Sequence, residues 1–298
     1  MTNSAAERMA RAGFPFARFM QNHVPLPAAN WFINHSRKLT RLDGGVTRET
    51  VTADGVPCIR LVPPGSPTDR VLLYLHGGGF VFGLSMLHLQ TGAWLARKME
   101  SQVLMVDYRL APQHPFPAAL DDCATAYRRL LQQGVPAGDI TVAGDSAGGN
   151  LTLALLMKLR DEGDPLPAAA ACLSPVADLS VARDQTDYRD PMLPPKAMEL
   201  YSRSYVADHD PRDPLISPVF GRWDGLPPLL IHAGEDEILR EDAVRVEELA
   251  RAAGVEARLE IYPRMWHVWQ INLGMPEAVH SLDDIAQFLR AHQHDRTG

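Results

Sequence analysis

Short, almost continuous runs of apolar residues recur along this 298-residue chain, separated by longer amphipathic segments. Runs of five or six such residues are typical of strands covered on both faces, and the segments between them are typical of helices. The expected strands are 51–62 (an outer strand pair), 71–75, 103–106, 140–142, 169–173, 229–233 and 257–261. The expected helices include 117–132, 196–206, 241–253, 278–292 and one that directly follows the strand at 140–142. Strand and helix alternate, which predicts an α/β fold with a central, mostly parallel sheet and helices on both faces.

Two segments depart from this alternation. Residues 1–45 look helical and rich in aromatic residues, and residues 180–225 are dense in proline, aspartate and arginine. A helical insertion at the carboxyl edge of a parallel sheet lies where ligands bind. We therefore predict a helical cap made of 1–45 and 180–225 over a core made of 46–179 and 226–298. The aromatic residues expected to face a pocket, or else to pack in a core, are Phe16, Phe19, Trp31, Tyr201 and Tyr205.

The strand at 140–142 runs into the sequence GDSAG at 144–148, which has the form G-x-S-x-G. A strand that turns sharply into a helix through this pattern is a nucleophile elbow. Gly144 and Gly148 allow the close approach of strand and helix that the turn needs, because neither carries a Cβ. The pattern predicts that Ser146 is an exposed nucleophile at a helix N-terminus.

Three adjacent glycines, Gly77, Gly78 and Gly79, follow His76 at the end of a buried strand. Such a run costs backbone entropy, so it indicates backbone that must approach a ligand closely. Ester hydrolysis passes through an oxyanion that backbone N–H groups stabilise. Two of the three glycines are expected to donate, together with Ala147 after the serine, and the sequence leaves open which two. A phosphate-binding loop fits poorly, because the Lys-Ser/Thr ending is missing.

A serine nucleophile needs a base, and His267 is the best placed of the eleven histidines. In this arrangement the chain order is serine, acid, histidine, with each residue near a strand end. His267 follows the strand at 257–261, whereas the remaining late histidines fall in the last helix or the tail.

The acid that orients the base is expected in the loop after the strand at 229–233. This loop carries several acids, and Asp236 is our choice as the first aspartate after the glycine that closes the strand. Glu235 and Glu237 stay open as alternatives, while Glu241 and Asp242 suit the start of the next helix.

Composition limits the remaining classes of function. A net charge of −7 argues against nucleic acid and against stable anchoring on anionic membranes. The three cysteines are far apart and form neither a disulfide framework nor a zinc site. No signal peptide or membrane span is evident in the sequence. These features predict a soluble, cytoplasmic protein without metal or cofactor.

Taken together, the motifs resemble those of the hormone-sensitive lipase-like family of bacterial carboxylesterases. The matching stretches are HGGGF at 76–80, DYRLAPQHPFPAALDD at 107–122, GDSAGGN at 144–150, DEILRED at 236–242 and YPRMWH at 262–267. The resemblance implies the α/β-hydrolase fold with a helical cap, and it places the acid on Asp236. It also implies that homodimers are an option. Trp266 stands where a smaller residue is familiar, and could narrow the pocket.

The leading hypothesis is a carboxylesterase that cleaves short- to medium-chain acyl esters through Ser146, His267 and Asp236. A second hypothesis is other acyl-transfer chemistry on the same residues, such as hydrolysis of amides, lactones or acetylated substrates. A third is a binding protein, because some relatives of this fold are plant hormone receptors that lack the histidine. The presence of His267 speaks against that third class.

Overall fold

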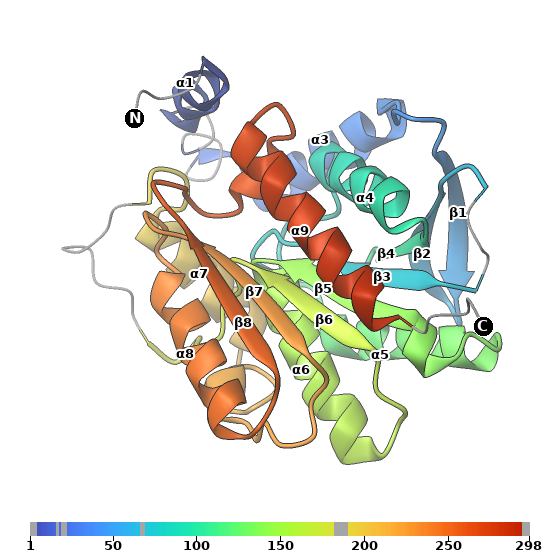
Figure 1. Cartoon of the computed structure of the whole chain (residues 1–298). Coiled ribbons are helices and arrows are strands. Elements are labelled where there is room, and N and C mark those ends of the chain that lie inside the picture. The colour runs from blue at the N-terminus through green and yellow to red at the C-terminus, as the bar shows by residue number, and fades with distance from the viewer. Residues whose placement is uncertain (1–4, 16–17, 19–22, 66–68, 182–189, 294–298) are drawn as a thin grey trace.

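The computed structural model describes residues 5–15, 18, 23–65, 69–181 and 190–293. Within these ranges the chain forms an eight-stranded sheet with the order β1-β2-β4-β3-β5-β6-β7-β8 (Figure 1). The strands are β1 Thr47–Ala53, β2 Val56–Val62, β3 Val71–Leu75, β4 Gln102–Val106, β5 Ile140–Asp145, β6 Ala169–Leu173, β7 Leu229–Gly234 and β8 Ala257–Tyr262. β2 pairs antiparallel with β1 and β4, and all pairs from β4 to β8 are parallel. The predicted mostly parallel sheet is confirmed.

Helices cover both faces of the sheet, as the alternation of strand and helix predicts. The described helices are α1 Ala5–Ala12, α3 Leu26–Leu39, α4 Met86–Met99, α5 Ala118–Gln132, α6 Ala147–Glu162, α7 Pro195–Val206, α8 Arg240–Ala252 and α9 Pro276–His292. Of these, α4 and α9 pack on one face of the sheet and α5, α6 and α8 on the other. In β3, Leu73 packs in the apolar core shared with α5, α6 and α8, while Leu72 and Tyr74 pack in the core shared with α4 and α9. The inner strands β3 to β7 are therefore buried on both sides, which explains their continuous apolar runs, whereas the edge strands β1 and β8 are partly exposed.

The outer strand pair is a hairpin. β1 and β2 are joined by Asp54 and Gly55, whose φ angles are 47° and 92°. Two positive φ angles in a two-residue connection suit the right-handed twist of the flanking strands, and Asp-Gly is a favoured pair there. β2 then pairs with β4, so the hairpin closes one end of the sheet.

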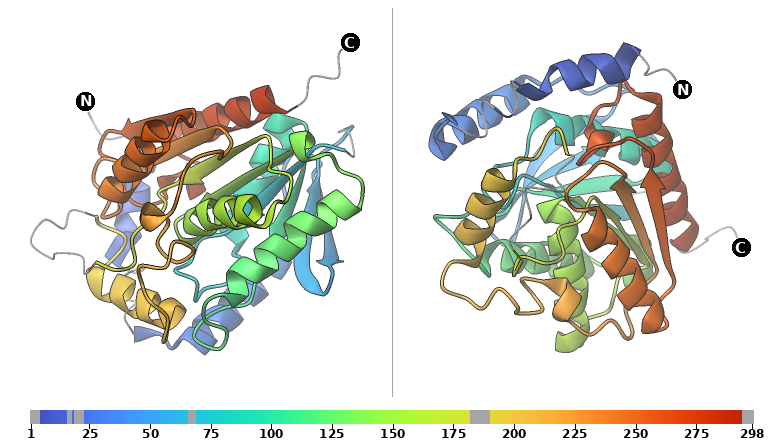
Figure 2. Two further views of the ribbon diagram at one scale, coloured as in Figure 1. Left: turned by 90° about the horizontal axis from the view of Figure 1, so that it is seen from below. Right: turned by 90° about the vertical axis from the view of Figure 1, so that its left-hand side faces the viewer.

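The two segments predicted as a cap lie on the carboxyl side of the parallel strands. α1 and α3 lie along the outside of the molecule, and α7 lies near α3 and away from α1 (Figure 2). Phe16 and Phe19 are outside the described residues, whereas Trp31 is described and is 63% exposed. The exact division into cap and core stays a prediction. No helix of the described ranges combines the length and the apolar character needed to cross a bilayer.

Candidate active site

Ser146 lies at the turn between β5 and α6, in the strained conformation of a nucleophile elbow. Its φ and ψ are 54° and −116°, and it is the N-cap of α6. A Cβ on Gly144 would overlap the carbonyl of Gly148, and a Cβ on Gly148 would overlap the carbonyl of Leu75. The two glycines therefore let the backbones approach as closely as the turn requires.

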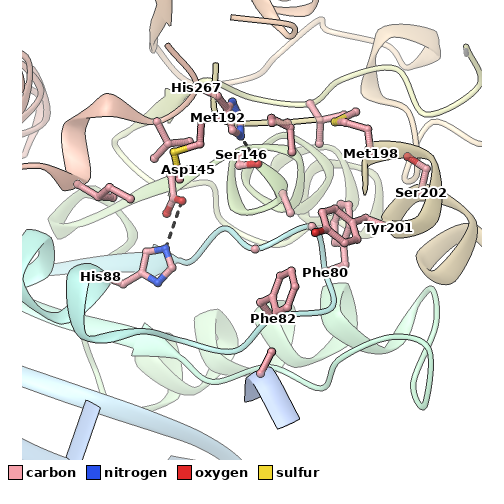
Figure 3. Close-up of a pocket in the computed structure, with 18 of the residues that line it drawn as sticks. Phe80, Phe82, His88, Asp145, Ser146, Met192, Met198, Tyr201, Ser202 and His267 are labelled. Carbon is pink, nitrogen blue, oxygen red and sulfur yellow. Dashed lines mark hydrogen bonds and ion pairs between the residues drawn. The ribbon is translucent and has the colours of Figure 1, made fainter. Parts of the chain in front are cut away.

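His267 lies in the loop after β8 and contacts the nucleophile directly. Its Nε2 is 2.8 Å from Ser146 Oγ, so the sequence prediction that these two residues meet agrees with the geometry (Figure 3). The side chain is buried, with 6% of the residue exposed. Hydrogen-bond contact between a hydroxyl and a buried imidazole is the geometry from which a base removes a proton.

The acid beside His267 is Glu237 and not the Asp236 preferred from the sequence. Glu237 Oε2 lies 3.9 Å from His267 Nδ1, and Glu237 is buried. The Asp236 carboxylate is turned the other way, is 30% exposed and lies 4.0 Å from Arg11 Nη2. The sequence leaves Glu237 open as an alternative, but consecutive residues of a loop point in different directions that no local pattern reveals.

Ser174, at the end of β6, fixes the position of Glu237. Its hydroxyl donates a hydrogen bond of 2.5 Å to Glu237 Oε2 and accepts one of 3.2 Å from the backbone N–H of Val268. This single hydroxyl therefore joins the acid to the residue after His267. Ser174 is not predicted from the sequence, because nothing in the local pattern separates it from an ordinary strand-end serine.

Backbone contacts also hold together the loops that carry the acid and the base. The N–H of Asp236 donates to the carbonyl of Met265 at 2.9 Å, and the N–H of Glu235 donates to that of Tyr262 at 2.9 Å. A Cβ on Gly234 would overlap the Met265 carbonyl. These backbone contacts fix the position of the acid relative to the base.

Helix α1 packs against the loop that carries His267. Glu7 is buried and forms ion pairs with Arg11 at 3.0 Å and with Arg264 at 3.2 Å. Arg11 donates to the Arg264 carbonyl at 2.8 Å and lies over the Trp266 ring at 5.0 Å. Trp266 also packs edge-on against Phe14 at 4.9 Å. Trp266 thus holds α1 in place instead of narrowing the pocket.

The three glycines of the loop after β3 differ in their hydrogen bonding and in their position relative to the cavity. The N–H of Gly77 donates to Asp145 Oδ1 at 3.0 Å, so it is already engaged within the protein. Gly78 and Gly79 have φ angles of 119° and 60°, and both line the cavity in front of Ser146. Of the three glycines that the sequence proposes, Gly78 and Gly79 therefore remain the candidates for oxyanion donors. Ala147 also lines the cavity, at the N-terminus of α6.

Asp145 anchors this loop and was not assigned a role from the sequence. Besides the Gly77 bond, its Oδ1 accepts a hydrogen bond of 2.8 Å from the Tyr74 hydroxyl, and its Oδ2 lies 3.4 Å from His88 Nε2 (Figure 3). The backbone N–H of Ser85 donates to His88 Nδ1 at 3.1 Å, so a neutral His88 carries its proton on Nε2. Burial alone raises the pKa of Asp145, but His88 and Tyr74 reverse this and hold it below its ordinary value.

The cavity in front of Ser146 has a volume of about 340 Å³, which is at the small end of the range for ligand sites. Its walls combine the core with both cap segments, and most of its side chains are apolar. The apolar lining residues are Ala29, Phe32 and Ile33 from α3, Phe80 and Phe82 after the glycine loop, and Val176, Leu179, Met192, Leu193, Met198, Val268 and Ile271. Tyr201 also lines it, whereas Tyr205 is fully buried against Phe80, with ring centroids 3.7 Å apart.

Burial sets the protonation of the acid and the base. It lowers the pKa of His267 to about 4, with the negative charge of Asp145 opposing the shift. It raises the pKa of Glu237 well above its ordinary value, with the hydrogen bond from Ser174 opposing the shift. Both shifts have the same cause, because a low-dielectric site disfavours either charged form. His267 is therefore neutral at pH 7, as a base must be before it accepts a proton.

This shift predicts the acid limb of the pH–rate profile. Since neutral His267 is the active form and its pKa is lowered to about 4, kcat/KM for p-nitrophenyl butyrate should stay flat as pH falls through the ordinary histidine range. It should halve near pH 4. The measurement is a stopped assay in which released nitrophenol is read after adding alkali, with circular dichroism at each pH as the folding control. A midpoint at or above the ordinary histidine pKa, with the fold intact, would contradict the assignment.

Comparisons with known proteins identify the family of this chain. A family model described as the alpha/beta hydrolase fold matches residues 72–271. An acetyl-hydrolase of Streptomyces hygroscopicus is 41% identical over 250 residues, which cover 83% of this chain and 84% of that one. An esterase of Acinetobacter venetianus is 37% identical and covers 74% of each chain. The crystal structure of an esterase from the bacterial hormone-sensitive lipase family superposes with a TM-score of 0.92 at 35% identity, over 99% of this chain and 100% of that one. The chain thus belongs to the α/β-hydrolase fold family and is, within it, a carboxylic ester hydrolase of the hormone-sensitive lipase type.

Proposed function

We propose that this enzyme hydrolyses short- to medium-chain acyl esters through a covalent acyl-enzyme on Ser146. The observation that carries the proposal is the 2.8 Å contact between Ser146 Oγ and His267 Nε2 at the floor of a largely apolar cavity. A nucleophile in contact with a neutral base, beside free N–H donors, is what acyl transfer requires. A binding protein would have no use for this constellation.

In the proposed mechanism, Ser146 Oγ attacks the ester carbonyl carbon while His267 takes the hydroxyl proton. The N–H groups of Gly78, Gly79 and Ala147 hold the oxyanion. When the tetrahedral intermediate collapses, the ester C–O bond breaks and His267 returns its proton to the departing alcohol. A water molecule then attacks the acyl-enzyme in the same way and releases the acid. The site supplies preorganised donors, a base and an apolar enclosure, which together favour the charged transition state.

Glu237 takes the role of the orienting acid in this proposal. Its carboxylate faces Nδ1 of His267 at 3.9 Å, and such contacts tighten when substrate binds. As His267 becomes an imidazolium, the nearby positive charge favours the ionised form of Glu237. The carboxylate then holds the ring in the tautomer that leaves Nε2 free to accept the serine proton.

The acyl preference is tested with p-nitrophenyl esters from about two to twelve acyl carbons. Because the cavity is small, kcat/KM should peak among the short esters and fall steeply for the longest ones. The relative from Streptomyces hygroscopicus is named an acetyl-hydrolase, which supports the short end of the range. A rate that keeps rising to the longest ester would contradict the proposal, and no turnover of any ester would move the search to amides and lactones. A cytoplasmic location and a homodimer stay predictions.

A further inference from the structure

The cavity contains one buried hydroxyl that the proposed mechanism does not use. Outside the reacting groups, its polar side chains are few: His88 and Asp145 are paired with each other, and Tyr201 and Ser202 come from α7. The hydroxyl of Tyr201 is buried and has no hydrogen-bond partner among the described residues. Only 6% of the residue is exposed. A buried hydroxyl without a hydrogen-bond partner costs free energy, so a bound substrate is the natural source of a partner for Tyr201.

The Tyr201 ring is held in place beside the oxyanion loop. A Cβ on Gly79 would lie 2.7 Å from Tyr201 Cγ, so the ring fills the space that the glycine leaves empty. Phe82 packs edge-on against the same ring, with the centroids 5.5 Å apart and the planes at 82°. In Figure 3 the hydroxyl oxygen of Tyr201 is directed into the cavity. A fixed donor that faces a binding cavity next to the scissile bond can select substrates.

We propose that Tyr201 donates a hydrogen bond to an ether, hydroxyl or carbonyl oxygen on the substrate, beyond the ester group that is cleaved. The inference rests on the proposed esterase function and names its substrate class: small esters that carry an additional acceptor oxygen. Burial raises the pKa of Tyr201, so the hydroxyl keeps its proton and can donate at every working pH. A purely alkyl substrate displaces solvent from this hydroxyl without replacing its hydrogen bond, and it therefore loses part of its binding energy.

The test compares esters of equal shape that differ by one oxygen. On the acyl side the pair is p-nitrophenyl pentanoate and p-nitrophenyl methoxypropanoate. On the alcohol side it is butyl butyrate and methoxyethyl butyrate. The measured quantity is the ratio of kcat/KM for the oxygen-bearing ester to that for its alkyl partner. Y201F removes the hydroxyl and keeps the ring, so this ratio should fall by about three- to tenfold in at least one pair, since one neutral hydrogen bond is lost.

Tyr205 offers a matched control. It lies four residues further on in the same helix, and its hydroxyl is also buried without a partner among the described residues, but it does not line the cavity. Y205F should leave both ratios unchanged, and both variants should keep the thermal midpoint of the wild type. The pair that responds to Y201F shows whether the oxygen lies on the acyl or the alcohol part.

Two results would overturn the inference. If both ratios are the same in Y201F and the wild type, the Tyr201 hydroxyl makes no hydrogen bond to an oxygen of these substrates. If Y201F lowers kcat/KM equally for all four esters, the hydroxyl supports the reacting groups instead of selecting substrates. The wild-type rate on p-nitrophenyl pentanoate separates these outcomes from failure of the proposed function. If the proposed function is wrong, the wild type itself does not hydrolyse this ester.

Discussion

Replacing Ser146 with alanine is expected to lower kcat for p-nitrophenyl butyrate by about 10⁴- to 10⁶-fold, as loss of the nucleophile does in serine hydrolases. Ser146 Oγ is the hydroxyl that contacts His267 Nε2, at 2.8 Å, so S146A removes the group from which the base takes its proton. The residual rate comes from the N–H donors and the cavity, which remain. Steady-state kinetics on purified S146A against the wild type measures the effect.

The control for S146A is its stability. Ser146 is the N-cap of α6 and makes no side-chain cap hydrogen bond, so loss of its hydroxyl should leave the thermal midpoint almost unchanged. A variant that keeps its fold and more than about a hundredth of the wild-type rate would show that the reaction uses another nucleophile, since removal of a true nucleophile costs far more.

The second large effect separates two neighbouring acids. Glu237→Gln should lower kcat by about 10³- to 10⁴-fold, because an amide cannot hold the imidazole in the productive tautomer or stabilise its charged form. Asp236→Asn should change kcat by no more than about threefold, because its carboxylate is partly exposed and forms only a long ion pair with Arg11. The two variants are matched: each converts a carboxylate to its amide, in the same loop, one residue apart.

Measuring kcat for both variants on one ester decides the assignment. The reverse pattern, with D236N inactive and E237Q active, would restore the aspartate that the sequence favours and reject the geometric choice. Loss of activity in both variants, with folds intact, would mean that the loop as a whole sets the position of His267. A pH profile of E237Q adds a check, because the acid limb should stay near pH 4 if His267 alone sets it.

Local features of the sequence predicted most of the fold. The strand at 71–75 coincides with β3, and the predicted strand at 169–173 coincides with β6, because both are fully buried apolar runs between clear breaks. The elbow was equally accessible, since Gly144 and Gly148 mark a turn that other residues cannot make. The helix α4 was not singled out, although it carries His88 into the cavity.

What the sequence could not provide is the direction of side chains in loops. Glu237 and Asp236 differ by one position, yet one faces His267 and the other faces Arg11. Among the three glycines, Gly77 is distinguished by a bond to Asp145, which is 68 residues away along the chain. These outcomes depend on contacts between distant segments. Asp145 is a charged residue at the end of a buried strand, and buried charges need partners. This feature of the sequence could have predicted that Asp145 binds a neighbouring loop.

The contact between α1 and the histidine loop has a consequence for how the enzyme is made. The Arg11 side chain binds the Arg264 carbonyl across 253 positions of the chain, and Glu7 binds Arg264 across 257. The ribosome produces α1 well before the loop that α1 supports, because more than 250 positions separate them. A nascent chain that already contains the nucleophile and the oxyanion loop still lacks its base and that base's support. The site is therefore complete only after the loop with His267 has been synthesised and has packed against α1.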